Sequence, residues 1–256
     1  GGFLHLCIVG DVFDDKHWLG FQQCQLCFCE RVVSVIGDST FMHSGLTGLA
    51  EMVYNVPPTG HLLLILDTSS SMNTRDGVGG TSRLATAISA LNQLLDSYDN
   101  FGEVRVRLVA FSDVSSSRGS GWMAVSEAKA LLAALTPRGG TNYDEALATA
   151  QSAFTTPGKL ASGQNIAYFL SDGQPHSNTV IGTTDEAAWK SYLQTNQITS
   201  FALGMGVAAI QSYLDPIAYN GVTRTNLDGQ VISDFNQLSS ALQATVPTPA
   251  AGEILS

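Results

Sequence analysis

Five oxygen-bearing residues occur at spacings that suit a single metal site. They lie in three separate pieces of the chain: Asp67, Ser69, Ser71, Thr141 and Asp172. Two carboxylates and three hydroxyls form a donor set for a hard divalent cation, for which Mg²⁺, Ca²⁺ and Mn²⁺ are candidates. The compact, hydroxyl-rich set favours Mg²⁺. Because only two donors carry charge, the site leaves a position for an incoming carboxylate.

Each of these residues also has an ordinary structural interpretation. The two serines could cap a turn, Thr141 could cap the helix that follows it, and Asp172 could begin a turn with the next glycine. Taken singly, these interpretations are favoured. Asp113 could orient a metal-bound water and His176 could line the ligand rim, but both are interpreted as ordinary surface residues. The joint occurrence of the five residues in order, at the ends of predicted strands, favours the metal site.

Two apolar strands position the aspartates. Residues 61–66 form an apolar run that ends at Asp67, which is typical of a central parallel strand covered on both faces. Residues 165–171 form a second apolar strand that ends at Asp172. In open parallel sheets, ligands bind beyond the carboxyl ends of the strands. The sequence therefore predicts that the two carboxylates meet at one edge of the sheet.

Amphipathic segments alternate with further strands. Helical spacing predicts helices over residues 83–98 with Ser82 as N-cap, over 125–135, 143–154 and 235–242, and a capping box of Thr183 and Glu186 opens another. Strands are predicted over residues 104–111, nearer an edge of the sheet, and over 199–205 and 231–232, while the Ser/Gly-rich stretch 112–121 is predicted to be a loop. This alternation predicts an α/β fold: a doubly wound, mostly parallel open sheet with helices on both faces.

Composition limits the partners. The chain of 256 residues is 44% hydrophobic, enough for one sizeable core. Its net charge of −10 would repel a nucleic-acid backbone or an anionic membrane. No stretch approaches the roughly 18 consecutive apolar residues that would span a bilayer. Only 13% of residues are charged, a balance more common in secreted surface modules than in cytosolic enzymes. We therefore expect neither nucleic acid nor a membrane span.

The chain divides into three parts. Residues 1–57 show no sustained periodicity and contain all the cysteines: Cys7, Cys24, Cys27 and Cys29. These cysteines could ligate zinc, but the cluster lacks a second well-spaced pair. Consecutive prolines then mark a boundary, so residues 58–246 are predicted to form the main domain and 247–256 a linker. Because the sequence begins without Met, we expect it to be part of a longer polypeptide.

At this point the motifs resemble a known family. D-x-S-x-S over residues 67–71, Thr141 after a glycine pair, and Asp172 after an apolar strand are similar to the metal-ion-dependent adhesion site of the von Willebrand factor type A domain. The resemblance covers residues 60–246. It implies that the hydroxyls bind Mg²⁺ directly or nearly so, that the aspartates act largely through water, and that a partner's carboxylate completes the shell. It implies a binding module rather than an enzyme.

A narrower resemblance concerns the phrases LLLILDTSSSM, GGTNYDEAL and YFLSDGQP. They look like the type A domain of very large bacterial surface adhesins, which are secreted by a type I system and carry calcium-binding nonapeptide repeats. This resemblance implies an extracellular or cell-surface location and a protein or cell-surface ligand. The sequence contains no Gly-Gly-x-Gly-x-Asp repeat, and its cysteine-bearing start departs from that group.

Two other functions stay open at this stage. In a Mg²⁺-dependent phosphoryl-transfer enzyme, Asp67 would be the nucleophile. Phosphatases that resemble the haloacid dehalogenases place a second aspartate two residues on, where this chain has Ser69, and no G-x-x-x-x-G-K-[ST] loop is present. In a structural spacer, the cation would only stiffen the loops, and a partner assay would separate this role from adhesion.

Overall fold

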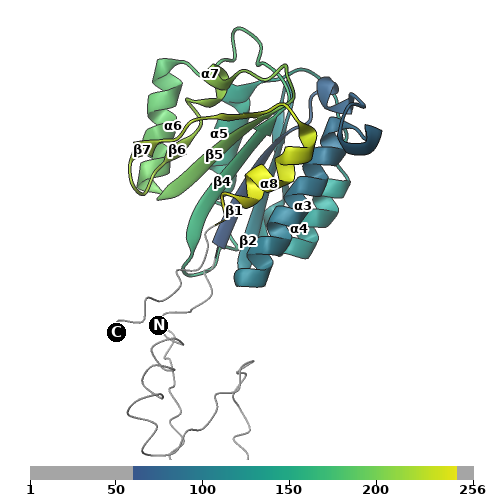
Figure 1. Cartoon of the computed structure of the whole chain (residues 1–256). Helices are drawn as coiled ribbons and strands as arrows, with labels where there is room; N and C mark the ends of the chain where they lie inside the picture. The colour runs from purple at the N-terminus through teal and green to yellow at the C-terminus, as the bar shows by residue number, and fades with distance from the viewer. Residues whose placement is uncertain (1–59, 247–256) are drawn as a thin grey trace, which may run out of the picture. The chain divides into compact units, whose positions relative to one another are not determined.

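The computed structural model describes residues 60–246 (Figure 1). The segment predicted over residues 1–57, the zinc interpretation of its cysteines, and the linker 247–256 lie outside the described residues. None of the described helices is long and apolar enough to cross a membrane.

An eight-stranded sheet forms the centre of the domain, in the order β3-β2-β1-β4-β5-β6-β7, with β8 paired to β5. The parallel strands are β1 (Gly60–Asp67), β2 (Val104–Phe111), β4 (Gln164–Ser171), β5 (Ile198–Met205) and β8 (Gln230–Ile232). Three others run antiparallel to their neighbours: β3 (Ser115–Met123), β6 (Tyr219–Asn220) and β7 (Thr225–Asn226). The predicted mostly parallel sheet is confirmed.

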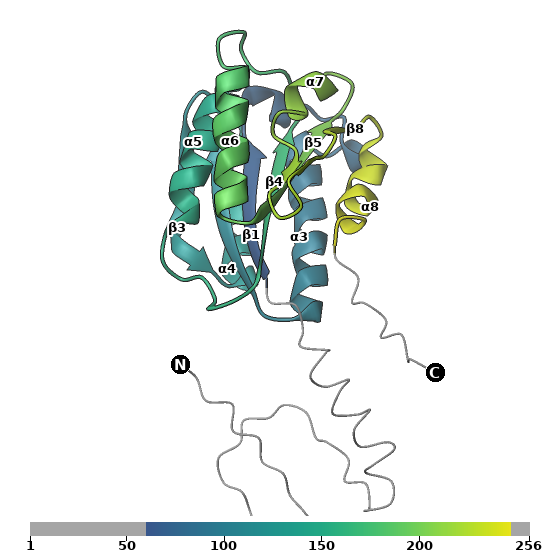
Figure 2. The same ribbon diagram turned by 90° about the vertical axis from the view of Figure 1, so that its left-hand side faces the viewer.

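Helices cover both faces of the sheet, as Figure 2 shows. One face packs against α3 (Arg83–Phe101), α4 (Val125–Ala133) and α8 (Leu238–Gln243). The other packs against α5 (Tyr143–Phe154), α6 (Thr183–Thr195) and the short α7 (Gln211–Leu214). Single turns of 3₁₀ helix occur at η2 (Ser70–Asn73), η3 (Val78–Gly80) and η4 (Phe235–Gln237).

Strand β1 is the central strand that its sequence predicts. Leu62, Leu64 and Leu66 pack on the α3 side, whereas Leu63 and Ile65 pack on the α5 side, and none of them is exposed. A strand with two buried faces has no place for a polar side chain, and this explains the uninterrupted apolar run. The apolar run of β1 therefore places Asp67 at the carboxyl edge of the sheet.

The Ser/Gly-rich stretch is not a loop over most of its length, because residues from Ser115 onward form β3, antiparallel to β2. Serine and glycine carry little strand signal, and the pairing comes from the neighbouring backbone. As a result, β2 is not an edge strand. Arg107 is only 1% exposed and donates to the carbonyls of Arg118 and Gly119 in β3.

Helix starts agree with the sequence in one case and differ in another. Ser82 caps α3, because its hydroxyl accepts a hydrogen bond from the amide of Ala85 at 3.1 Å. The predicted capping box at α6 is wrong. Gly182 is the N-cap, Thr183 is already helical, and Glu186 pairs instead with Lys190 one turn later.

Candidate metal centre

Asp67 is a buried carboxyl at the end of β1, with no exposed surface. Its Oδ1 accepts a hydrogen bond from the amide of Ser69 at 2.7 Å, and its Oδ2 accepts one from the hydroxyl of Ser171 at 2.5 Å. Burial raises the pKa of Asp67 to about 7, with a smaller contribution from the charge of Asp172, while the hydrogen bonds oppose the shift. Among the described residues, no basic side chain forms an ion pair with Asp67.

A chain of hydroxyls joins the loop after β1 to the loop after β4. The hydroxyls of Ser69 and Ser71 lie 2.9 Å apart, and that of Ser71 donates to Oδ1 of Asp172 at 2.7 Å. Because the Ser71 proton points to the carboxylate, Ser69 is the donor between the two serines. Parallel pairing of Leu66 with Leu170 sets this register. Four of the five predicted residues thus form one hydrogen-bonded group.

Thr141, the fifth residue, lies in a loop that is held to the same place by its backbone. The Ser70 amide donates to the carbonyl of Gly139 at 2.9 Å, and the His176 amide donates to the carbonyl of Thr141 at 3.1 Å. Thr141 is buried, yet no hydrogen bond of its hydroxyl is found among the described residues. The structure places this loop against both others without joining the threonine side chain to the network.

Arg83 is a site residue that the sequence analysis missed. Its Nη1 donates to Oδ2 of Asp172 at 2.8 Å, while Nε and Nη2 hold both oxygens of Asp76 at 2.8 and 2.7 Å. The hydrogen bonds from Arg83 lower the pKa of Asp76, and those to the two carboxylates raise the pKa of Arg83. A basic first residue opposes the dipole of α3, and this anomaly is the sequence signal that could have identified it. Ser171, also missed, carries no such signal.

Asp113 and His176 form a loose pair at the rim, with Nε2 and Oδ1 at 3.5 Å and each side chain more than half exposed. Their surface placement is confirmed. A Cβ on Gly140 would lie 2.2 Å from Nε2 of His176 and 2.4 Å from Oδ1 of Asp113. Gly139 has a φ of +77°, a region that favours glycine. The glycine pair therefore lets three loops meet closely at this rim.

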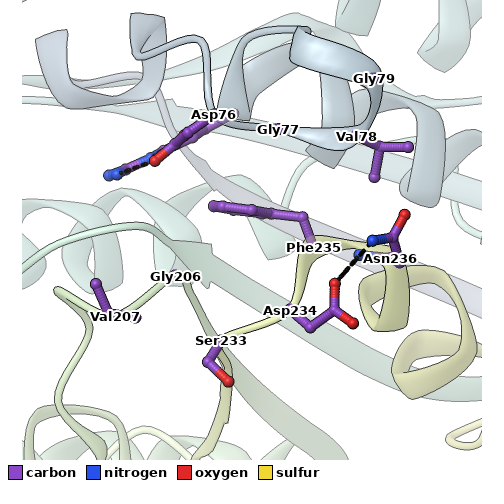
Figure 3. A pocket seen from close by; sticks show the side chains of 11 residues that line it. Asp76, Gly77, Val78, Gly79, Gly206, Val207, Ser233, Asp234, Phe235 and Asn236 are labelled. Atoms are coloured by element: carbon purple, nitrogen blue, oxygen red, sulfur yellow. Dashed lines mark hydrogen bonds and ion pairs between the residues drawn. The ribbon is translucent and has the colours of Figure 1, made fainter.

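A hollow of about 370 Å³ lies beside Arg83 (Figure 3). Its walls come from the loop after β1, from the loop after β5, and from residues 233–236. The ring of Phe235 extends from one wall toward the loop that carries Asp76, and its centroid lies 5.9 Å from the guanidinium carbon of Arg83. The two carboxylates in its walls are those of Asp76 and Asp234.

The donor chemistry of the group around Asp67, in which Ser71 is exposed and the other residues are buried, fits a hard divalent cation. It contains two carboxylates and serine hydroxyls, with the Thr141 hydroxyl unused nearby. In the described part of the chain, no group of three or more His, Cys, Asp and Glu side chains is arranged to hold a metal. A cation bound here would therefore depend on hydroxyl ligands as well as carboxylates.

Comparison with known proteins agrees with this architecture. Residues 62–174 match the family model of the von Willebrand factor type A domain, and all five predicted residues fall inside the match. The described part of the chain has the fold of solved von Willebrand factor type A proteins.

Three solved structures illustrate the similarity. Proximal thread matrix protein 1 from the mussel byssus, with a zinc-occupied MIDAS motif, is 18% identical over 78% of this chain and 50% of its own, with a TM-score of 0.58. A von Willebrand factor type A protein from Catenulispora acidiphila is 20% identical over 73% of this chain and 41% of its own, with a TM-score of 0.55. The pilus adhesin SpaC from Lactobacillus rhamnosus GG is 18% identical over 74% and 30%, with a TM-score of 0.56.

At sequence identities this low, the similarity to these three proteins shows a shared fold only. The chain spans half or less of the length of each of these three proteins. A comparison with curated proteins gave no match.

Proposed function

We propose that this domain is a protein-binding module that holds one divalent cation, preferentially Mg²⁺, and grips an acidic group of its partner. The proposed ligands are those that the sequence predicts: Asp67, Ser69, Ser71, Thr141 and Asp172. One observation carries the proposal: the fully buried carboxyl of Asp67 has hydrogen-bond donors but no cationic partner among the described residues. A buried carboxylate without a cation is costly, and a bound cation would remove that cost.

The roles of the residues follow from their contacts. The hydroxyls of Ser69 and Ser71 are already held between the two loops, so they are preorganised as neutral ligands. Thr141 offers, from the third loop, a hydroxyl for which no hydrogen bond is found among the described residues. When bound, the cation supplies positive charge and an open position for a carboxylate. Arg83 offsets the charge of Asp172 and so reduces repulsion of an acidic partner.

We further infer that the domain belongs to a larger secreted or cell-surface bacterial adhesin and carries out no catalysis. Support comes from the fold shared with the pilus adhesin SpaC and with the minor pilin PilB of Streptococcus sanguinis, at 18% and 13% identity. The narrower resemblance to type I-secreted adhesins stays a prediction. The mussel protein with zinc at its MIDAS motif supports metal binding and leaves the choice of metal to experiment.

The test titrates the full chain with Mg²⁺, Ca²⁺ and Mn²⁺ by calorimetry. Asp67→Asn keeps the shape of the side chain, and we expect it to weaken binding at least about tenfold, the scale on which metal sites respond to altered ligand surroundings. Thr141→Val should weaken it as well. The matched control, Asp113→Asn, removes the same charge from an exposed rim position and should bind as the wild type does. Equal affinities in Asp67→Asn and the wild type would refute the metal site.

The adhesive role needs a second measurement. Surface plasmon resonance on an immobilised peptide that contains glutamate should give binding in Mg²⁺ that is lost with a chelator and absent on the matching glutamine peptide. Metal-dependent stabilisation without any such binding would instead favour the spacer role.

A further inference from the structure

A second hollow, of about 260 Å³, lies on the α4 side of the sheet, at its β3 edge. Its walls come from the loop after β1, from strands β2 and β3 and the loop between them, and from the loop after α4. The polar lining residues are Thr68, Ser112, Ser116, Arg118, Thr136 and Arg138. No aspartate or glutamate of the described part of the chain lines this hollow. Two arginines and four hydroxyls therefore surround a space without an acidic group.

Neither arginine has a carboxylate partner in the described residues. The lysine and arginine ion pairs found there use Arg83, Arg105, Lys129 and Lys190. For Arg118, even the Nε atom is buried and has no hydrogen-bond partner within residues 60–246. Buried polar atoms are nearly always paired with protein, water or ligand. In a chain with a net charge of −10, two unpaired arginines at one hollow indicate a site for an anion.

The fold explains how these groups converge. Ser116 and Arg118 lie two residues apart on β3, opposite Ala110 and Leu108 of β2, so their side chains share one face of the sheet. The amide of Arg138 donates to the carbonyl of Thr68 at 2.7 Å, which fixes the other wall. The second hollow thus begins at Thr68, directly after Asp67 in the chain.

The hydroxyls differ in their availability as donors. Thr68 donates its proton to the carbonyl of Phe111 at 2.9 Å, and Ser112 makes a long contact of 3.4 Å to the carbonyl of Val114. Within residues 60–246, no hydrogen bond is found for the hydroxyls of Ser116 and Thr136. These two hydroxyls add neutral donors to those of the two guanidinium groups.

The hollow of Figure 3 provides a contrast. Its walls contain the carboxylates of Asp76 and Asp234, and its one arginine, Arg83, is already committed to Asp76 and Asp172. An anion would be repelled there and attracted at Arg118 and Arg138.

We propose that the second hollow binds an oxyanion, as a sulfate, phosphate or carboxylate group, through Arg118 and Arg138 with help from Ser116 and Thr136. Guanidinium groups suit such anions because their parallel N–H groups match two oxygens. A volume of about 260 Å³ is just below the range of drug-sized sites, about 300–1,000 Å³, so it suits one ionic group of a ligand. This site goes beyond the metal-dependent binding proposed above and does not depend on it.

The experiment uses the full chain after removal of divalent ions on a chelating resin, so that no metal can hold the anion. Sodium sulfate, phosphate and acetate are titrated separately against sodium chloride at matched ionic strength, and binding is followed by calorimetry. The anion that binds most tightly shows whether the site prefers a sulfate, a phosphate or a carboxylate group. We expect at least one oxyanion to bind in preference to chloride.

Three single variants locate the site. Arg118→Gln and Arg138→Gln should each weaken oxyanion binding by about tenfold, as expected for a lost charge-assisted hydrogen bond. Arg105→Gln, the matched control, removes the same charge from an arginine that is paired with Glu103 and should leave affinity unchanged. Because no hydrogen bond of the Arg118 side chain is found among the described residues, Arg118→Gln should unfold at the wild-type temperature. If that variant does not fold, the affinity of Arg138→Gln tests the site instead.

The proposal is wrong if no oxyanion binds better than chloride, or if Arg105→Gln loses as much affinity as the hollow variants. The two proposals fail independently. Loss of Mg²⁺ binding is read from Asp67→Asn in metal, whereas oxyanion binding is read from the metal-free wild type.

Discussion

Arg83→Met gives a quantitative test of how the site is held together. The substitution keeps a similar apolar stem but leaves Asp172, which has no exposed surface, without its only cationic partner among the described residues. Breaking a buried ion pair by removing one partner costs about 3–5 kcal/mol. Because the bond to Asp76 is half exposed and adds little, we expect the lower end, about 3 kcal/mol. For a domain of this size that corresponds to a fall in Tm of about 6–12 °C.

Differential scanning fluorimetry with and without Mg²⁺ measures this prediction and its connection to the proposed cation. In Arg83→Met the unpaired carboxylate should bind the cation more tightly, so Mg²⁺ should raise the Tm of the variant more than that of the wild type. Arg105→Met is the control, since its ion pair with Glu103 is largely exposed and contributes about 0–1 kcal/mol. A Tm for Arg83→Met equal to that of Arg105→Met would refute the view that Arg83 compensates a buried charge.

Two further predictions concern the scaffold. Burial lowers the pKa of His61 from its ordinary value of 6.5, and the neutral ring donates from Nδ1 to Asn165. The contribution of His61 to stability should therefore be full above about pH 6.5 and fall as the pH drops toward the folded pKa, whereas the raised pKa of Asp67 acts in the opposite direction. Urea unfolding of the wild type and of His61→Gln at pH 7.5 and 5.5 isolates the His61 contribution, because the difference in stability between the two proteins should shrink at pH 5.5. Gly221→Ala should destabilise the domain by about 1–3 kcal/mol in the same assay, because its Cβ would lie 2.2 Å from the backbone oxygen of Leu193, whereas Gly60→Ala, with its nearest contact at 3.9 Å, should be neutral.

Much of the fold could be predicted because its signals are local. The apolar run of β1 and the spacing of apolar residues in α3, α4 and α5 each reflect burial of a strand or of one helix face, and these elements lie where the sequence places them. Strand β3 could not be predicted, because its serines and glycines have no strand preference and depend on β2 for pairing. The short β6, β7 and α7 are too brief for any period to appear.

The candidate site also contains features that the sequence predicts and features that it does not. Asp67 and Asp172 could be predicted to lie near each other, since each ends a parallel strand and β1 pairs with β4. The position of Arg83 at the start of a helix is a sequence signal, but its partner could not be predicted, because the bond to Asp172 joins residues 89 positions apart and depends on the way α3 enters above the sheet. The sequence also could not predict that the Thr141 hydroxyl stays outside the hydrogen-bond network of the described residues, because it predicts the position of the loop but not the direction of one side chain.

The charges of the buried group connect its structure to the proposed role. When Asp67, whose pKa burial raises to about 7, is ionised, Asp67 and Asp172 contribute two negative charges and Arg83 contributes one positive charge; all three side chains are buried or nearly so. This group is therefore negative by one charge and would attract a divalent cation. With that cation it would become positive by one, which favours a partner's carboxylate. A third carboxylate in place of a serine would bind the cation but cancel this attraction, and this is a physical reason for hydroxyls at residues 69 and 71.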